Sequence, residues 1–191
     1  MDRIDDERIR FYLKHQELIE TWAAVRKDAR EVTHEFFLSL TDDLGERAAG
    51  LGGDLAVWRN EKTYSKVGLY RPSWEGEDEP VVQVCLEWHK QATFTTGVRF
   101  VGVRASYGTA DGKNLRPYLG DALRGIRDAA GFGRSSNHWP AYQPVLEPDG
   151  EFWNDLGDYR NGLLDTIESA WVSFSEPIQH AVAEWRASGT N

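Results

Sequence analysis

Two stretches in the middle of the chain decide the fold: PVVQVCLEWH at residues 80–89 and VRFVGVRASY at residues 98–107. In both, apolar side chains alternate with other side chains, which is the pattern of a β-strand with one buried face. Residues 66–74 continue the pattern, and Val57 with Trp58 marks a candidate fourth strand. Because the connections between these segments are short, we expect an antiparallel meander rather than a parallel sheet.

The alternation also predicts which side chains share a face, since neighbouring residues of a strand point to opposite sides. The expected core side carries Val82, Val84, Leu86 and Trp88, joined by Val101, Val103 and Ala105. The other side carries Gln83, Cys85, Glu87 and His89, beside Phe100 and Arg104. This second face mixes apolar with charged groups, so it is the natural place to look for a site.

Helical periodicity predicts the segments on either side of the sheet. Helices are expected over residues 4–27, 31–48, 115–130 (with Asn114 as N-cap) and 155–174, with a kink or a new helix at Pro177. We therefore expect one α+β domain: a small antiparallel meander of three or four strands packed with N- and C-terminal helices. Its parts are a helical segment (1–50), the sheet (54–107), and helices with a long aromatic loop at 131–154 (108–191).

The first predicted helix carries apolar residues on two sides. One stripe is Ile4, Phe11, Leu18 and Val25, and the other is Ile9, Tyr12, Leu13 and Ile19. A helix on the surface of a domain needs only one apolar stripe. Two stripes predict a helix that is covered on both sides, either by its own domain or by a partner chain, and the second alternative predicts a homodimer through residues 4–27.

Composition excludes several classes of function. A net charge of −9, from 22 basic and 31 acidic residues, argues against non-specific binding of nucleic acid. The single cysteine, Cys85, excludes an internal disulfide and a thiolate-rich metal site, and fits a reducing compartment. No apolar run approaches the roughly 18 residues of a membrane span. No cationic–apolar leader follows Met1. We expect a cytoplasmic protein without a cofactor.

One enzymatic alternative rests on Glu87 and His89, which stand two residues apart and so share a face. A metal-dependent nuclease or phosphodiesterase needs carboxylates for a divalent ion and a lysine near the attacking water. Lys90 stands one position too late and points to the opposite face. An ion pair between Glu87 and Arg104 on the neighbouring strand explains the glutamate more simply.

The loop at 131–154 is the least random feature of the chain. Its aromatic side chains include Trp139, Tyr142 and Trp153, with His138 beside them. They either cap one side of the sheet or line a recognition surface for a peptide, a base or an aromatic ligand. The second possibility favours binding over chemistry.

Five short motifs resemble the C-terminal accessory region of bacterial PD-(D/E)xK nuclease family proteins. They are GLYRPSW (68–74), CLEW (85–88), GVR (102–104), HWPAY (138–142) and FWN (152–154), within residues 60–175. The catalytic domain that precedes this region in the family has no counterpart here, so no catalytic residue is implied. The resemblance implies a sensing, antitoxin or immunity-type module of a prokaryotic defence system.

From these observations we expect a binding module, with no catalytic residue and no metal ligand, that recognises a protein partner. Its expected binding residues are Tyr70, Trp74, Glu87, His89, Phe100, Arg104, His138, Trp139, Tyr142 and Trp153. The alternatives are the nuclease-like enzyme that uses Glu87 and His89, and a small-molecule sensor with an aromatic pocket.

Overall fold

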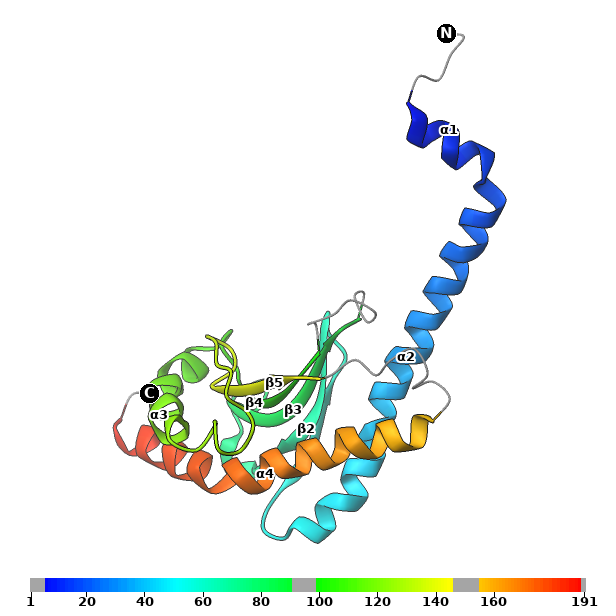
Figure 1. Ribbon diagram of the computed structural model, residues 1–191. Helices are drawn as coiled ribbons and strands as arrows, with labels where there is room; N and C mark the ends of the chain where they lie inside the picture. The colour runs from blue at the N-terminus through cyan, green and yellow to red at the C-terminus, as the bar shows by residue number, and fades with distance from the viewer. Residues whose placement is uncertain (1–5, 91–98, 146–154, 190–191) are drawn as a thin grey trace.

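A five-stranded antiparallel sheet, with strands ordered as in the chain, forms the centre of the molecule (Figure 1). The computed structural model describes residues 6–90, 99–145 and 155–189. The strands are β1 (Ala56–Asn60), β2 (Tyr64–Tyr70), β3 (Val82–His89), β4 (Arg99–Ala105) and β5 (Ala141–Pro144). The predicted α+β class is confirmed, but the sheet has five strands rather than three or four. The fifth strand comes from the segment expected to be a loop, where Tyr142 pairs with Gly102.

As expected, helices precede and follow the strands in the sequence, but their bounds differ from the predicted ones. They are α1 (Glu7–Lys14), α2 (Gln16–Leu51), α3 (Ala110–Arg124) and α4 (Leu156–Ala187), with a 3-10 turn η1 (Pro72–Trp74) after β2. The predicted break near residues 28–30 is wrong: α2 continues through them, and the chain bends instead at His15. No new helix starts at Pro177, because α4 runs through this proline.

The start of α3 differs from the prediction for a local reason. The expected N-cap is Asn114, yet the helix begins five residues earlier, at Ala110 with Thr109 as its N-cap. The hydroxyl of Thr109 accepts a hydrogen bond from the amide of Gly112 at 3.1 Å, which satisfies one of the unpaired amides of the first turn. Two residues, Thr109 and Asn114, could serve as caps, and the structure uses the first.

One face of the sheet forms the core, as the alternation predicted. Its buried residues are Val67, Leu69, Val82, Val84, Leu86, Trp88, Val101, Val103 and Ala105. Helices α2 and α4 pack on this face (Figure 1). Toward one end of this face, the indole of Trp88 contacts Phe37 and donates a hydrogen bond to Nδ1 of His34 at 3.0 Å. Burial lowers the pKa of His34, which favours the neutral ring that accepts this bond.

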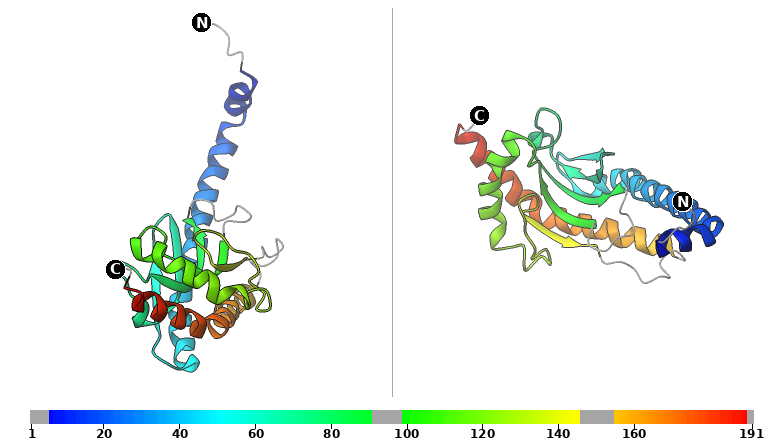
Figure 2. Two further views of the ribbon diagram at one scale, coloured as in Figure 1. Left: turned by 90° about the vertical axis from the view of Figure 1, so that its left-hand side faces the viewer. Right: turned by 90° about the horizontal axis from the view of Figure 1, so that it is seen from above.

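Charged side chains fasten α2 to α4. Arg47 on α2 donates to Asp165 at 2.6 Å and to Glu168 at 3.1 Å. In the opposite direction, Arg160 on α4 forms an ion pair with Asp43 on α2. Helix α3 lies against the C-terminal half of α4, at the end of the body away from the N-terminus (Figure 2).

The N-terminal part of the molecule projects from this body (Figures 1 and 2). We call residues 6–32, which comprise α1 and the first half of α2, the arm; none of its residues is buried. Over the parts of the chain that the structure describes, no helix is both long enough and apolar enough to cross a membrane.

Candidate functional site

The face of the sheet opposite the core carries the mixture of side chains that the sequence predicted. We call it the mixed face: Trp58, Lys66, Cys85, Glu87, Phe100 and Arg104, with Trp139 and Tyr142 at its β5 edge. Strand register brings these residues together, because Lys66 stands opposite Glu87 and Glu87 opposite Phe100. Residues directly opposite one another in neighbouring strands point to the same side.

Glu87 lies at the centre of the mixed face between two cations. Its Oε2 accepts a hydrogen bond from Nε of Arg104 at 3.1 Å, and Nζ of Lys66 lies 3.9 Å from the same oxygen. All three side chains are at most 15% exposed. The ion pair between Glu87 and Arg104 that the sequence predicted is therefore present, and Lys66 adds a second cation to it.

The cations in turn stack on aromatic rings. The guanidinium of Arg104 lies 5.8 Å from the ring of Trp139, and the ammonium of Lys66 lies 5.6 Å from that of Trp58. Such cation–π contacts are stronger where water is partly excluded. The carboxylate of Glu87 and these two rings thus hold both cations in place.

Three aromatic rings complete the β5 edge of the mixed face. Phe100 contacts Tyr142 edge to face at 5.2 Å and Trp139 at 5.9 Å. Trp139 is only 4% exposed, whereas Phe100 and Tyr142 are partly accessible. Trp139 therefore forms the support of the cluster, and the other two rings form its surface.

The floor of the mixed face is flat because of two glycines beside Cys85. Gly68 on β2 and Gly102 on β4 both stand opposite this cysteine. A Cβ at Gly68 would lie 2.3 Å from the backbone oxygen of Val84, so the strands approach too closely for any side chain. Burial raises the pKa of the Cys85 thiol, which keeps it protonated and unreactive.

The structure separates the other expected residues from this cluster. Trp74 is fully buried on the core side, where its indole donates to Gln179 at 2.8 Å and its ring meets Trp171. His89 lies at the far end of β3 and contacts Tyr64 edge to face. Trp153 lies outside the described residues.

Two expected residues lie near the ends of the mixed face. Tyr70, at the end of β2, donates a hydrogen bond to Glu75 at 3.2 Å. The backbone oxygen of His138 accepts from Arg104 at 3.4 Å, while its ring turns to Tyr107.

Sequence reasoning missed Lys66 and Trp58 as members of the site. Lys66 stands four residues before Tyr70, so its place on the same side of β2 could have been read from the alternation. Trp58 could not, because its position depends on the pairing of β1 with β2, where it stands opposite Gly68.

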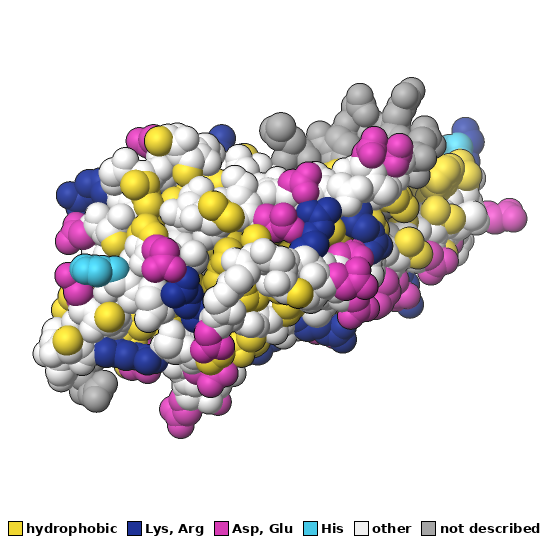
Figure 3. Space-filling view, turned by 90° about the horizontal axis from the view of Figure 1, so that it is seen from below, with side chains coloured by type: hydrophobic (Ala, Val, Ile, Leu, Met, Phe, Trp, Pro, Cys, Tyr) yellow, Lys and Arg dark blue, Asp and Glu magenta, His cyan; other side chains and the backbone are white. Residues whose placement is uncertain are grey.

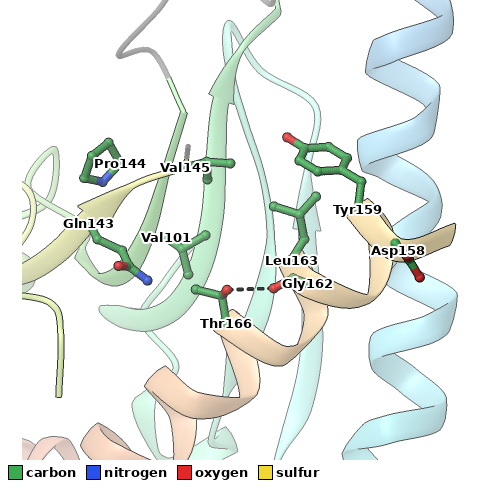
Figure 4. A pocket seen from close by; sticks show the side chains of 9 residues that line it. All are labelled: Val101, Gln143, Pro144, Val145, Asp158, Tyr159, Gly162, Leu163 and Thr166. Carbon is green, nitrogen blue, oxygen red and sulfur yellow. Dashed lines mark hydrogen bonds between the residues drawn. The ribbon is translucent and has the colours of Figure 1, made fainter. Parts of the chain in front are cut away.

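A separate cavity of about 300 Å³ lies between the β4–β5 edge and the start of α4 (Figure 4). Its walls are mainly apolar, and Tyr159 is the aromatic residue among them. The lining residues are Val101, Gln143, Pro144, Val145, Asp158, Tyr159, Gly162, Leu163 and Thr166. The hydroxyl of Thr166 is committed to the backbone oxygen of Gly162 at 2.7 Å. None of the residues that the sequence singled out for binding lines this cavity.

Within the described residues, no three histidine, cysteine, aspartate or glutamate side chains come close enough together to hold a metal ion. Comparison with known proteins adds no assignment: no protein-family model, no curated protein and no solved structure matches the chain. Its function is therefore inferred from its own side chains.

Proposed function

We propose that this chain is a non-enzymatic interaction module that binds a protein partner through its mixed face. The observation that carries the proposal is the ordered set of Phe100, Arg104, Trp139 and Tyr142, which contact one another before any partner arrives. Arginine, tryptophan and tyrosine supply most of the residues that dominate binding energy in protein interfaces. Because these side chains are already held in place, little conformational entropy is lost on binding.

The contacts of Glu87 and His89 support binding over metal-dependent hydrolysis. A divalent ion at Glu87 would have to displace both Lys66 and Arg104 from its carboxylate. His89 contributes its ring to a contact with Tyr64. The nuclease-like alternative would show itself as magnesium- or manganese-dependent cleavage that Glu87→Gln abolishes in a folded protein.

Replacement of Phe100 by alanine is expected to weaken capture of the partner about tenfold, since this half-buried ring joins Trp139 and Tyr142 at the surface. The measurement is affinity capture of the tagged full chain from its host lysate, followed by titration of the purified partner. Val172→Ala is the matched control, because Val172 is 71% exposed on α4, outside the mixed face. If Phe100→Ala bound the partner with the same affinity as Val172→Ala, the proposal would be contradicted. It would also be contradicted if no stoichiometric partner were captured.

The arm supports a second interaction of the same module, with another copy of the chain. Five of its large apolar side chains are between 48% and 66% exposed along one line: Phe11, Leu18, Trp22, Val25 and Val32. In the space-filling view, hydrophobic side chains are exposed toward the right-hand end and also between the charged groups of the body (Figure 3). A projecting helix of this kind gains little stability by itself, since most helical stability in proteins comes from packing of the apolar face.

The exposed residues follow a heptad pattern. Alternate steps of four and three residues join Phe11, His15, Leu18, Trp22, Val25, Ala29, Val32 and Phe36. This spacing is the signature of the seam between two helices of a coiled coil. The last member, Phe36, already packs against Tyr159 of the body, so the seam available to a partner ends near residue 32.

An antiparallel pair centred on residue 20 matches residue 8 of one copy with residue 32 of the other, so α1 and the first half of α2, which meet at the bend at His15, each face a segment of the other arm. The flanking positions suit this arrangement, because Lys14 then lies beside the partner's Asp28 and Thr21 beside the partner's Thr21. A parallel pair would instead place Lys14 beside the partner's Ile19 and Asp28 beside the partner's Thr33, with no ion pair. We therefore infer an antiparallel homodimer through the arm.

The substitution Trp22→Glu is expected to convert the dimer into a monomer, because it places a charge from each copy in the apolar seam. Analytical ultracentrifugation should give twice the 21.7 kDa of the chain for the wild type and for the control Val172→Glu, and a single chain mass for Trp22→Glu. Thr21→Cys should form an intermolecular disulfide and Val32→Cys should not, against the background of the buried Cys85. A monomeric wild type would contradict the homodimer, and cross-linking of Val32→Cys alone would contradict its antiparallel direction.

A further inference from the structure

A second pocket, of about 380 Å³, lies beside α3 and combines three arginines with three small polar side chains. Arg116, Arg124 and Arg127 come from α3 and the turn after it, and Ser135, Ser136 and Asn137 come from the segment that leads to β5. None of the described residues that line this pocket is acidic. In a chain of net charge −9, such a lining concentrates positive charge in one place.

Helical geometry explains why the three arginines converge. Arg116 and Arg127 are eleven residues apart, which brings them to within about 20° of each other around a helix, and Arg124 lies within about 80° of both. The turn continues past the end of α3, because the amide of Arg127 donates to the backbone oxygen of Leu123 at 3.1 Å. Gly120 stands between Arg116 and Arg124, and a Cβ at this glycine would meet no atom within 4 Å, so space remains between the two guanidinium groups.

Most of the donors in this pocket are uncommitted. Within the described chain, the side chains of Arg116, Ser135, Ser136 and Asn137 make no hydrogen bond or ion pair. The Nε atom of Arg127 is shielded from solvent and has no acceptor, and it lies 3.9 Å from the nearest carboxylate oxygen, that of Asp128. A shielded N–H group normally has a hydrogen-bond acceptor, so the unpaired Nε of Arg127 indicates that a ligand supplies this acceptor.

Arg124 does have a partner, in Asp121 at 2.9 Å. Both side chains of this ion pair are about three-quarters exposed, and exposed pairs of this kind contribute little. A ligand can therefore compete for Arg124 at small cost.

We propose that this pocket binds the phosphate group of a small phosphorylated metabolite. Guanidinium groups match phosphate oxygens with paired, charge-assisted hydrogen bonds, and serine hydroxyls with the Asn137 amide supply the remaining donors. The volume falls within the range of small-molecule sites and exceeds that of a bare phosphate ion, so the organic part of the ligand also enters. The proposal does not depend on the mixed face or on the arm.

Calorimetric titration of the full chain tests the proposal, with inorganic phosphate, pyrophosphate, adenosine 5′-monophosphate and adenosine as probes. Saturable binding of the monophosphate at physiological salt, with no binding of adenosine, is expected. Arg116→Gln and Arg127→Gln should each weaken this binding by about tenfold or more, whereas the matched control Arg59→Gln, at an exposed arginine paired with Glu61, should leave it unchanged.

Three results would overturn the proposal: no binding of the two inorganic anions or the monophosphate, equal binding of adenosine and its monophosphate, or equal affinities in Arg116→Gln and Arg59→Gln. Circular dichroism of each variant establishes that the fold is retained. Because these substitutions lie outside the mixed face and the arm, partner capture and dimer formation should remain as in the wild type. Each proposal can therefore be contradicted without affecting the others.

Discussion

Replacement of Gly102 by alanine is expected to lower the free energy of unfolding by about 3 kcal/mol. Gly102 has a φ of +152°, and a Cβ at this position would lie 2.3 Å from the backbone oxygen of Ala141 and 2.7 Å from Cα of Tyr142. The methyl group can enter only if β5 separates from β4, which would also move Tyr142 away from Phe100. Urea unfolding measures the loss, and the melting temperature should fall by about 10 °C for a chain of this size.

Gly45→Ala is the matched control for this variant. Gly45 is an exposed residue in the second half of α2, and a Cβ there would meet no atom within 4 Å. Alanine inside a helix is favoured over glycine by roughly 0.5–1 kcal/mol, so this variant should be slightly more stable than the wild type. If Gly102→Ala unfolded at the same urea concentration as the wild type, the close pairing of β4 with β5 would be contradicted.

Replacement of Glu87 by alanine is expected to cost about 3 kcal/mol of folding stability. The substitution leaves Lys66 and Arg104 as two poorly solvated cations without their common carboxylate, at 9% and 15% side-chain exposure. The loss comes from the desolvation cost of these charges, since an unpaired charge below the surface is costly. Chemical unfolding of the purified variant measures it.

Two further variants separate this cause from a general effect of truncation. Glu61→Ala removes a carboxylate whose pair with Arg59 is about half exposed, so its cost should stay below about 1 kcal/mol. The double substitution Glu87→Ala with Lys66→Met should recover part of the loss, because it removes one of the uncompensated charges. Equal costs for Glu87→Ala and Glu61→Ala would contradict the central role of Glu87 in the mixed face.

The core of the sheet was predictable because strand geometry is local. The alternation in β3 and β4 placed Val84, Leu86 and Trp88 on the core side, and the structure confirms this. The same alternation placed Glu87 and Phe100 on the opposite side, where the structure has them. Side-chain direction in a strand follows from the period of two alone.

Helix boundaries were less predictable, because several residues can end or begin a helix. Residues 28–30 contain no strong helix breaker, and α2 accordingly runs through them. Pro177 lies within α4, whose buried face includes Phe174 and Ile178 on either side of the proline. Here packing against the sheet outweighs the hydrogen bond that a proline removes.

The candidate site shows most clearly which features follow from local sequence and which depend on the tertiary structure. By itself, the sequence determined the α+β class, the two faces of the sheet and the presence of an apolar stripe on the first helix. Only the tertiary structure decided that Trp139 supports Phe100 and Arg104, that Trp74 lies on the core side, and that the arm is uncovered. Periodicity acts between residues a few positions apart, whereas these contacts join segments far apart in the chain. Such contacts depend on how β5 and α4 close over the rest of the molecule, which no local pattern records.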